Sequence, residues 1–111
     1  MELREESAGG VIILDVKGRV DSTTAPDFGE RLGAILGASQ SRLLVDFQQV
    51  DYISSAGFRV LLVAAKRAED SGSRLVLCRL SAKVRQLFDL GGFLDLFSVL
   101  PSREEALAAL G

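Results

Sequence analysis

The chain has no histidine and only one cysteine among its 111 residues. Histidine is the most common general base and the most common metal ligand in proteins, so its absence excludes a Ser–His or Cys–His catalytic pair. A zinc site would need carboxylates alone, which zinc seldom uses. Cys78 cannot form an internal disulfide, and its place in the apolar run Leu75–Cys78 favours a small buried hydrophobe over a reactive thiol. We therefore expect no metal, no cofactor and no enzymatic activity.

The sequence also lacks long apolar runs and clusters of basic residues. No apolar run approaches the roughly 20 residues that a membrane-spanning helix needs. The formal net charge is −2 and the lysines and arginines are scattered, which argues against a nucleic-acid-binding surface. The segment Met1–Glu6 is acidic and lacks the basic start and apolar core of a signal peptide. These features predict a cytoplasmic protein that binds neither membranes nor nucleic acid.

What the chain does contain is an ordinary globular composition, with 48% apolar and 25% charged residues. This composition argues against disorder. A chain of this length can build one hydrophobic core but has little room for a second. The sequence shows no repeats, low-complexity tracts or linkers. We predict one domain over residues 1–111, and we expect a monomer.

Alternating apolar and turn-forming segments predict the element order β-β-α-β-α-β-α-β-α. The predicted strands are 3–7, 11–16, 42–47, 74–78 and 96–99, and the predicted helices begin near 22–26, 55, 81 and 102. Gly9 and Gly10 fit a hairpin turn between the first two strands, whereas the later strand–helix–strand units call for parallel strands with right-handed crossovers. We therefore predict an α/β fold in which a small mixed sheet carries its helices mainly on one face.

Capping residues mark the starts of two of these helices. The hydroxyl side chains of Ser22–Thr24 offer caps for the first helix, and Pro26 suits its first turn. Ser102 is the predicted cap of the last helix, where Glu105 completes a capping box.

The helix after residue 54 has an apolar stripe that we expect to face the core. The stripe consists of Phe58, Leu61, Leu62, Ala65 and Ala68. Val60 and Val63 lie off this stripe, so we predict that they leave apolar area exposed.

Two serines, Ser54 and Ser55, stand where a strand and turn run into this helix. The first N–H groups of a helix have no intrahelical partner, and the helix dipole adds partial positive charge at that end. A serine at such a point can cap the helix, and its replacement by alanine then costs roughly 0.5–2 kcal/mol. It can also carry a phosphate, which a helix start tolerates well.

The segment Val50–Leu62 around these serines resembles the signature of STAS domains, specifically of the bacterial anti-sigma factor antagonists. Gly18–Asp21 is similar to the family's glycine-to-aspartate segment at the end of the second strand. Val45–Val50 is similar to the strand that leads into the signature, and Leu80–Phe88 to a third family segment. The resemblance covers nearly the whole chain in the right order and spacing, and it implies a STAS-like fold.

The resemblance also implies a function. In that family, an anti-sigma factor with serine kinase activity phosphorylates the serine before the helix. The unmodified protein binds the anti-sigma factor and frees the sigma factor, the phosphorylated form does not bind, and a dedicated serine phosphatase restores it. By position, Ser55 is the phosphoacceptor, and Asp21 supports kinase recognition or the partner interface. Many members have aspartate where Ser54 stands, so Ser54, with its own hydroxyl, is the alternative acceptor.

A phosphate on Ser55 would add about −1.5 to −2 charges, which a partner packed over the first helical turn would have to desolvate. Loops that follow parallel neighbouring strands emerge at the same sheet edge, which would place the loop of Asp21 beside Ser55 as part of one contact surface. The alternative is that this loop is only a solvated strand end followed by a helix cap. Gly57 allows either close approach of a partner or tight packing within the domain. The predicted partner-binding residues are Asp21, Ser22, Thr23, Ser54, Gly57, Arg59, Val60 and Val63.

Two other functions compete with this one. A constitutive scaffold subunit of a transporter or signalling complex would keep the fold without regulatory phosphorylation. In that case Ser55→Ala would be silent, whereas a charge at Val60 or Val63 would disrupt assembly. Nucleotide hydrolysis is disfavoured, because Gly9–Gly10 and Gly91–Gly92 lack the spacing and the lysine of a phosphate-binding loop.

Overall fold

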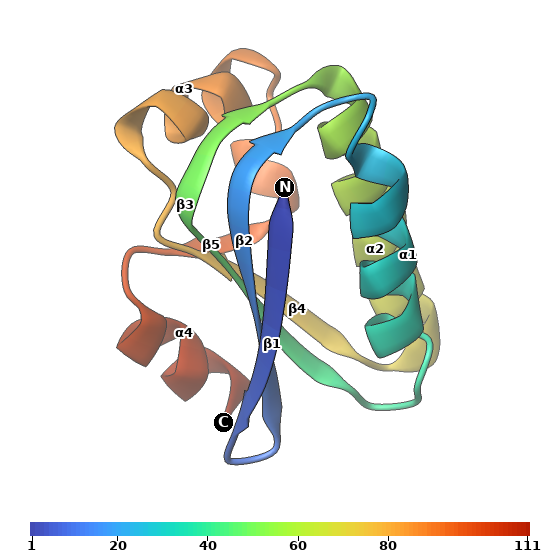
Figure 1. The fold of residues 1–111 in the computed structure, drawn as a ribbon. Helices are drawn as coiled ribbons and strands as arrows, with labels where there is room; N and C mark the ends of the chain where they lie inside the picture. Colours follow the sequence, from blue (N-terminus) through green and yellow to red (C-terminus); the bar gives the residue numbers. More distant parts are fainter.

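A five-stranded sheet in the order β1-β2-β3-β4-β5 forms the centre of the computed structural model, which describes residues Met1–Gly111 (Figure 1). The order of strands and helices along the chain is the predicted one, with one short 3-10 helix, η1, added. The elements are β1 (Glu2–Ala8), β2 (Val11–Val20), α1 (Ala25–Leu36), β3 (Arg42–Ile53), α2 (Ser55–Ser71), β4 (Arg74–Cys78), α3 (Ala82–Leu90), η1 (Leu94–Leu96), β5 (Ser98–Leu100) and α4 (Arg103–Leu110).

The sheet is mixed, as predicted. β1 and β2 pair antiparallel through a turn in which Gly9 and Gly10 have φ values of 57° and 82°, a left-handed conformation that glycine adopts without strain. The pairs β2–β3, β3–β4 and β4–β5 are all parallel. The predicted hairpin and parallel crossovers are therefore confirmed.

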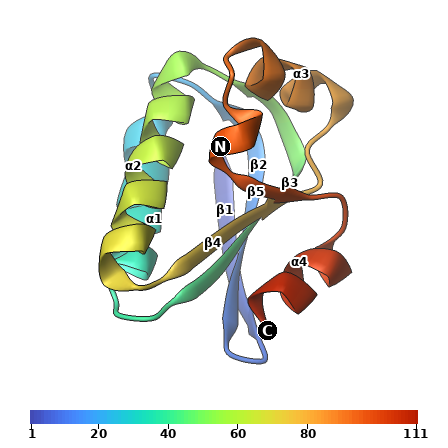
Figure 2. The same ribbon diagram turned by 180° about the vertical axis from the view of Figure 1, so that it is seen from behind.

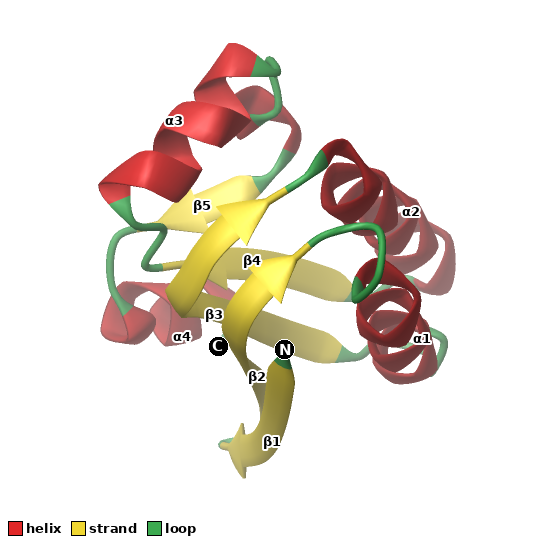
Figure 3. Ribbon diagram, turned by 45° about the horizontal axis from the view of Figure 1, so that its top comes forward, coloured by secondary structure: helices red, strands yellow, loops and turns green.

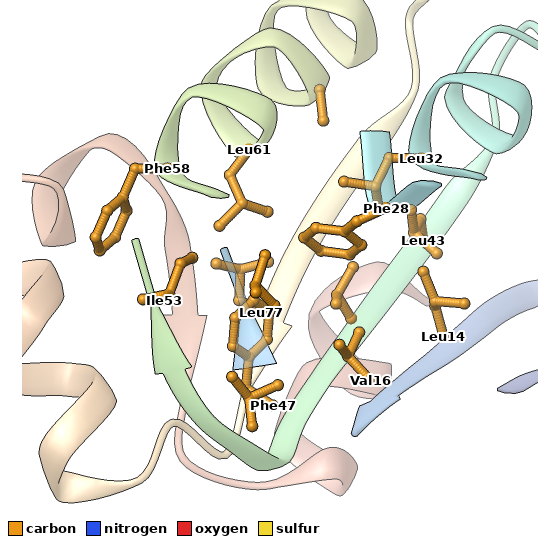
Figure 4. Close-up of a cluster of buried hydrophobic side chains, with 14 of the residues drawn as sticks. Leu14, Val16, Phe28, Leu32, Leu43, Phe47, Ile53, Phe58, Leu61 and Leu77 are labelled. Atoms are coloured by element: carbon orange, nitrogen blue, oxygen red, sulfur yellow. The ribbon is translucent and has the colours of Figure 1, made fainter. Parts of the chain in front are cut away.

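The main core lies between the sheet and three of the four helices. Phe28 and Leu32 of α1 and Leu61 of α2 cover strand residues such as Phe47 and Leu77 (Figure 4). α3 closes one end of this core, where the rings of Phe88 and Phe47 lie edge to face at 6.1 Å. The prediction that the helices lie mainly on one face is confirmed.

Helix α4 packs on the opposite face of the sheet, away from α1 and α2 (Figures 1 and 2). Its buried residues Ala106 and Leu110 contact a second, smaller cluster with Ile13 of β2, Leu44 of β3 and Val76 of β4. Two covered faces explain why the central strand β3 reads as a nearly continuous apolar run.

A buried carboxylate ties the start of α4 to the sheet. Asp46 of β3 is 2% exposed, and it accepts hydrogen bonds from Arg79 Nε at 3.0 Å and Arg103 Nε at 3.1 Å. Arg103 also donates to Asp15 at 2.6 Å and to Glu6 at 2.8 Å. Burial raises the pKa of Asp46, but the hydrogen bonds from Arg79, from the Gln48 N–H and from Arg103 together outweigh it and lower the pKa below its usual value.

Several predicted details differ from the structure. β3 continues to Ile53, beyond the predicted end at residue 47, because the strand stays paired with β2 as far as the last register pair, Val20 with Ile53. At the other edge, β5 begins at Ser98, since η1 occupies Leu94–Leu96.

The stripe of α2 and the cap of α1 also need correction. Leu62 is 36% exposed and Ala65 is only partly buried; the buried stripe runs instead through Ala64, which packs in the main core with Leu61 and Ala68. Thr24 is the N-cap of α1 but makes no side-chain cap bond, and the Asp21 carboxylate accepts the N–H bonds there. Ser102 caps α4 as predicted, accepting from the Glu105 N–H at 3.1 Å.

No helix in the structure combines the length and the apolar character that crossing a membrane requires.

Candidate functional site

The predicted site lies at one edge of the sheet, where β2 and β3 end side by side. Val20 and Ile53 are register partners, and the Ser54 N–H donates to the Val20 carbonyl oxygen at 2.8 Å. The loops that lead from β2 into α1 and from β3 into α2 therefore emerge together (Figure 3). This pairing places Asp21, which follows Val20, beside the Ser54–Ser55 junction.

The two serines of the junction occupy different environments. Ser54 is the N-cap of α2, with extended backbone angles (φ −94°, ψ 174°), and its hydroxyl accepts from the Gly57 N–H at 3.4 Å. Ser55 is the first residue of α2 and is exposed, and its hydroxyl makes no hydrogen bond within the protein. The first helical turn therefore offers one engaged and one free hydroxyl group.

Asp21 is held in an ionised, ordered state next to this junction. Its carboxylate accepts from the Thr24 N–H at 3.2 Å and the Thr23 N–H at 3.0 Å. The Thr24 hydrogen bond lowers the pKa of Asp21 below its usual value; desolvation opposes this shift, and the Thr23 bond reinforces it. Ser22 and Thr23 are exposed on the same loop. Asp21 both organises this loop and presents a negative charge at its surface.

Sequence reasoning missed Arg19 and Tyr52 as residues at this edge. The Arg19 guanidinium lies 4.4 Å from the centre of the Tyr52 ring, and its Nε is 3.7 Å from an oxygen of Asp21. Arg19 and Tyr52 are register partners on the neighbouring strands. Aligning the two parallel strands by their common ends would have brought this pair together from the sequence.

Gly57 is buried within the domain. A Cβ atom at this position would lie 2.7 Å from the Ile53 Cγ1 and 2.9 Å from the Val20 Cγ1, closer than side chains tolerate. Of the two explanations for this glycine, the geometry supports tight packing of α2 on the strand ends.

The remaining predicted residues lie farther along α2. Arg59 is exposed, Val63 is 61% exposed, and Val60 is partly buried against Gly29 of α1. The exposed apolar area predicted for both valines is therefore concentrated at Val63. Arg59, Val60 and Val63 belong to the lining of a groove of about 260 Å³ between α1 and α2. The full lining is Gly29, Gly33, Arg59, Val60, Val63, Ala64 and Arg67.

The chemistry available elsewhere in the chain is limited. No group of three or more Asp, Glu, Cys or His residues stands where it could share a metal ion. Cys78 is buried, and burial raises the pKa of its thiol to about 12, so the reactive thiolate is scarce at neutral pH.

Comparison with known proteins points to one family. The model of the STAS domain family matches residues 3–106. BtrV of Bordetella bronchiseptica, whose name places it among the anti-sigma factor antagonists, is 39% identical over 98% of this chain and 94% of its own length. The anti-sigma-B factor antagonist of Listeria monocytogenes is 30% identical over 89% of this chain and 86% of its own.

Solved structures show the same architecture. The crystal structure of an anti-sigma factor antagonist from Mycobacterium paratuberculosis superposes with a TM-score of 0.83 and 25% identity, over 98% of this chain and 92% of that one.

Proposed function

This chain belongs to the STAS domain family, and we propose that it is an anti-sigma factor antagonist whose binding is controlled by phosphorylation of Ser55. In its unmodified form it binds an anti-sigma factor that has serine kinase activity, and the sigma factor is released. Phosphorylation by that kinase ends the interaction, and a cognate serine phosphatase restores it. In this proposal the chain is a binding protein and a kinase substrate, it acts in the cytoplasm, and it exchanges between partners as a monomer.

The observation that carries the proposal is the difference between the two serines. A kinase needs a hydroxyl that it can reach and that no internal bond holds. The Ser55 hydroxyl meets both conditions, whereas the Ser54 hydroxyl caps the helix through the Gly57 N–H. The geometry thus favours Ser55 as the acceptor and leaves Ser54 with the capping role.

The electrostatics of the site support a switch that works without unfolding. A phosphate on Ser55 would sit at the start of α2, where the helix dipole and free N–H groups stabilise negative charge. The negative carboxylate of Asp21 lies on the adjoining loop. A partner covering both would have to bury a dianion next to a carboxylate, which is costly without a compensating cation.

The first experiment is intact-mass spectrometry of the protein isolated from its native host, with peptide mapping across residues 54 and 55. We expect a fraction that carries one phosphoryl group on Ser55. The kinase is then purified from the same host by its ability to transfer phosphate from ATP to Ser55. Absence of phosphate on either serine under all growth conditions would contradict the proposal and favour a constitutive scaffold.

The second experiment measures affinity for the purified kinase by calorimetry. Ser55→Asp should keep the fold, as judged by circular dichroism, and weaken binding severely, whereas Ser55→Ala should bind like the unmodified protein. Ser55→Asn is the matched control, because its side chain has the same shape as aspartate but carries no charge. Equal affinities of the wild type and Ser55→Asp would refute phosphorylation control.

A further inference from the structure

We infer that the groove between α1 and α2 docks an amphipathic helix of the partner that has a small apolar ridge flanked by carboxylates, and that a phosphate on Ser55 closes this site by capturing Arg59. The inference rests on the proposed function, since the partner is the anti-sigma factor kinase. It adds to that function a second contact surface, the chemistry of the segment that fills it, and a specific route by which the modification reaches it.

The shape of the groove comes from two glycines on α1. At Gly29 the helices approach so closely that a Cβ atom would lie 3.3 Å from the Val60 Cγ1. At Gly33, one turn later, a Cβ atom would meet nothing within 4 Å. The helices therefore touch at Gly29 and leave an open floor at Gly33, beside the exposed side chain of Val63.

The charge of the groove indicates what fills it. Its lining contains two arginines, Arg59 and Arg67, and no acidic residue. Both arginines are exposed, and neither forms an ion pair in the structure. An apolar floor between two unpaired guanidinium groups complements a helix that presents small apolar side chains with aspartate or glutamate on either side.

The position of Arg59 links this groove to the serine. Ser55 and Arg59 are four residues apart on α2, a spacing that brings side chains together on one helical face. A phosphate on Ser55 offers three acceptor oxygens and a stronger charge than a carboxylate of the partner. The guanidinium of Arg59 would turn to the phosphate and leave the groove with one cation in place of two.

Filling the groove is the most direct test of docking. Gly33→Leu adds a side chain to the open floor, where its Cβ atom would meet nothing within 4 Å, and Ala34→Leu is the matched control, since Ala34 faces a different cleft beside Leu3 and Arg31. We expect Gly33→Leu to weaken binding of the purified kinase about tenfold and Ala34→Leu to leave it unchanged. Arg67→Glu should also weaken binding, and more at low than at high salt.

The outcomes separate this inference from the proposed function. If Ser55→Asp abolishes binding while Gly33→Leu and Arg67→Glu bind normally, the groove is not a docking site and the phosphorylation switch stands. If the wild type does not bind the kinase, the proposed function fails and the docking inference fails with it.

The link between Ser55 and Arg59 has a test that needs no partner. Phosphoserine is incorporated at position 55, and the second pKa of its phosphate is followed by phosphorus NMR. Pairing with Arg59 favours the dianion, so we expect Arg59→Gln to raise this pKa by about 0.3 units, with Lys66→Gln, about 16 Å from Ser55 along the helix, as the control without effect. Identical pKa values in the wild type and Arg59→Gln would overturn the capture of Arg59.

Discussion

Replacing Asp46 with alanine should destabilise the protein far more than the loss of any single surface charge. The Asp46 side chain is 1% exposed and receives hydrogen bonds from both Arg79 and Arg103, so its removal breaks the link between β3, the end of β4 and the start of α4. Deleting one member of a buried ion pair costs about 3–5 kcal/mol. The two arginine side chains stay 32% and 28% exposed and keep part of their hydration, which places the expected cost near the lower end, about 3 kcal/mol.

The matched control for this prediction is Asp15→Ala. Asp15 contacts the same Arg103 at 2.6 Å, but its side chain is 27% exposed. Exposed ion pairs contribute about 0–1 kcal/mol, so Asp15→Ala should cost no more than that. Both substitutions remove one carboxylate that contacts Arg103; they differ in the burial of that carboxylate and in its contact with Arg79, which only Asp46 makes.

The assay is urea unfolding followed by circular dichroism, with the free energy of unfolding taken from the midpoint and slope. Domains of this size have total stabilities of about 5–15 kcal/mol, so the expected loss is easily measured. Asp46→Asn, which keeps the shape and can still accept hydrogen bonds, should lie between the wild type and Asp46→Ala, and it preserves the test if the alanine variant does not fold. Losses for Asp46→Ala and Asp15→Ala that agree within about 1 kcal/mol would refute the reasoning.

Four further predictions follow from the same structure. The folded state lowers the pKa of Asp46, so its ion pairs should add stability above about pH 4, and this stability should be lost as the pH falls through the lower pKa of the folded protein. The urea midpoint of the wild type should therefore fall at about pH 3, and the midpoint of Asp46→Ala should fall less. Gly57→Ala should cost about 1–3 kcal/mol despite the higher helix propensity of alanine, since its Cβ would lie 2.7 Å from Ile53; an unchanged melting temperature would contradict the packing argument. Ser54→Ala should lower the free energy of unfolding by about 0.5–1 kcal/mol, because the cap bond that it removes is long, at 3.4 Å, whereas Ser55→Ala should cost almost nothing. The opposite ranking in urea unfolding would reverse the roles of the two serines. The Cys78 thiol, buried and with its pKa raised to about 12, should resist a thiol reagent in the folded protein and react after unfolding; rapid modification at neutral pH would show that the thiol is accessible.

Much of the fold could be predicted because its signals are local. Glycines at positions 9 and 10 mark a tight turn, and Ser102 caps the helix that follows it, accepting from the Glu105 N–H group. The strand 74–78 was predicted with the bounds that the structure has. Signals of this kind depend on backbone conformation over a few residues, and the chain carries them in any context.

The predictions that failed depended on contacts between distant segments. The apolar periodicity of α2 allowed Leu62 on the buried stripe, but the packing of α2 against α1 and the sheet places Ala64 in the core and leaves Leu62 exposed. The predicted end of β3 at residue 47 is too early, since Gln49 and Val50 are still paired with β2. A strand ends where its partner ends, and the partner is not visible in the local pattern.

For the candidate site, the sequence by itself determined the ingredients: a strand end, two serines and a helix that begins there, with an aspartate at the end of the preceding strand. Only the tertiary structure decided how they are used. The parallel register of β2 and β3 set Asp21 beside the junction, and the capping geometry left Ser55 exposed with its hydroxyl free while Ser54 became occupied. The same holds for the groove at Gly33 and the buried carboxylate of Asp46. Hydroxyl reactivity, burial and charge pairing depend on which atoms lie within a few ångströms, and folding brings those atoms together from segments far apart in the chain.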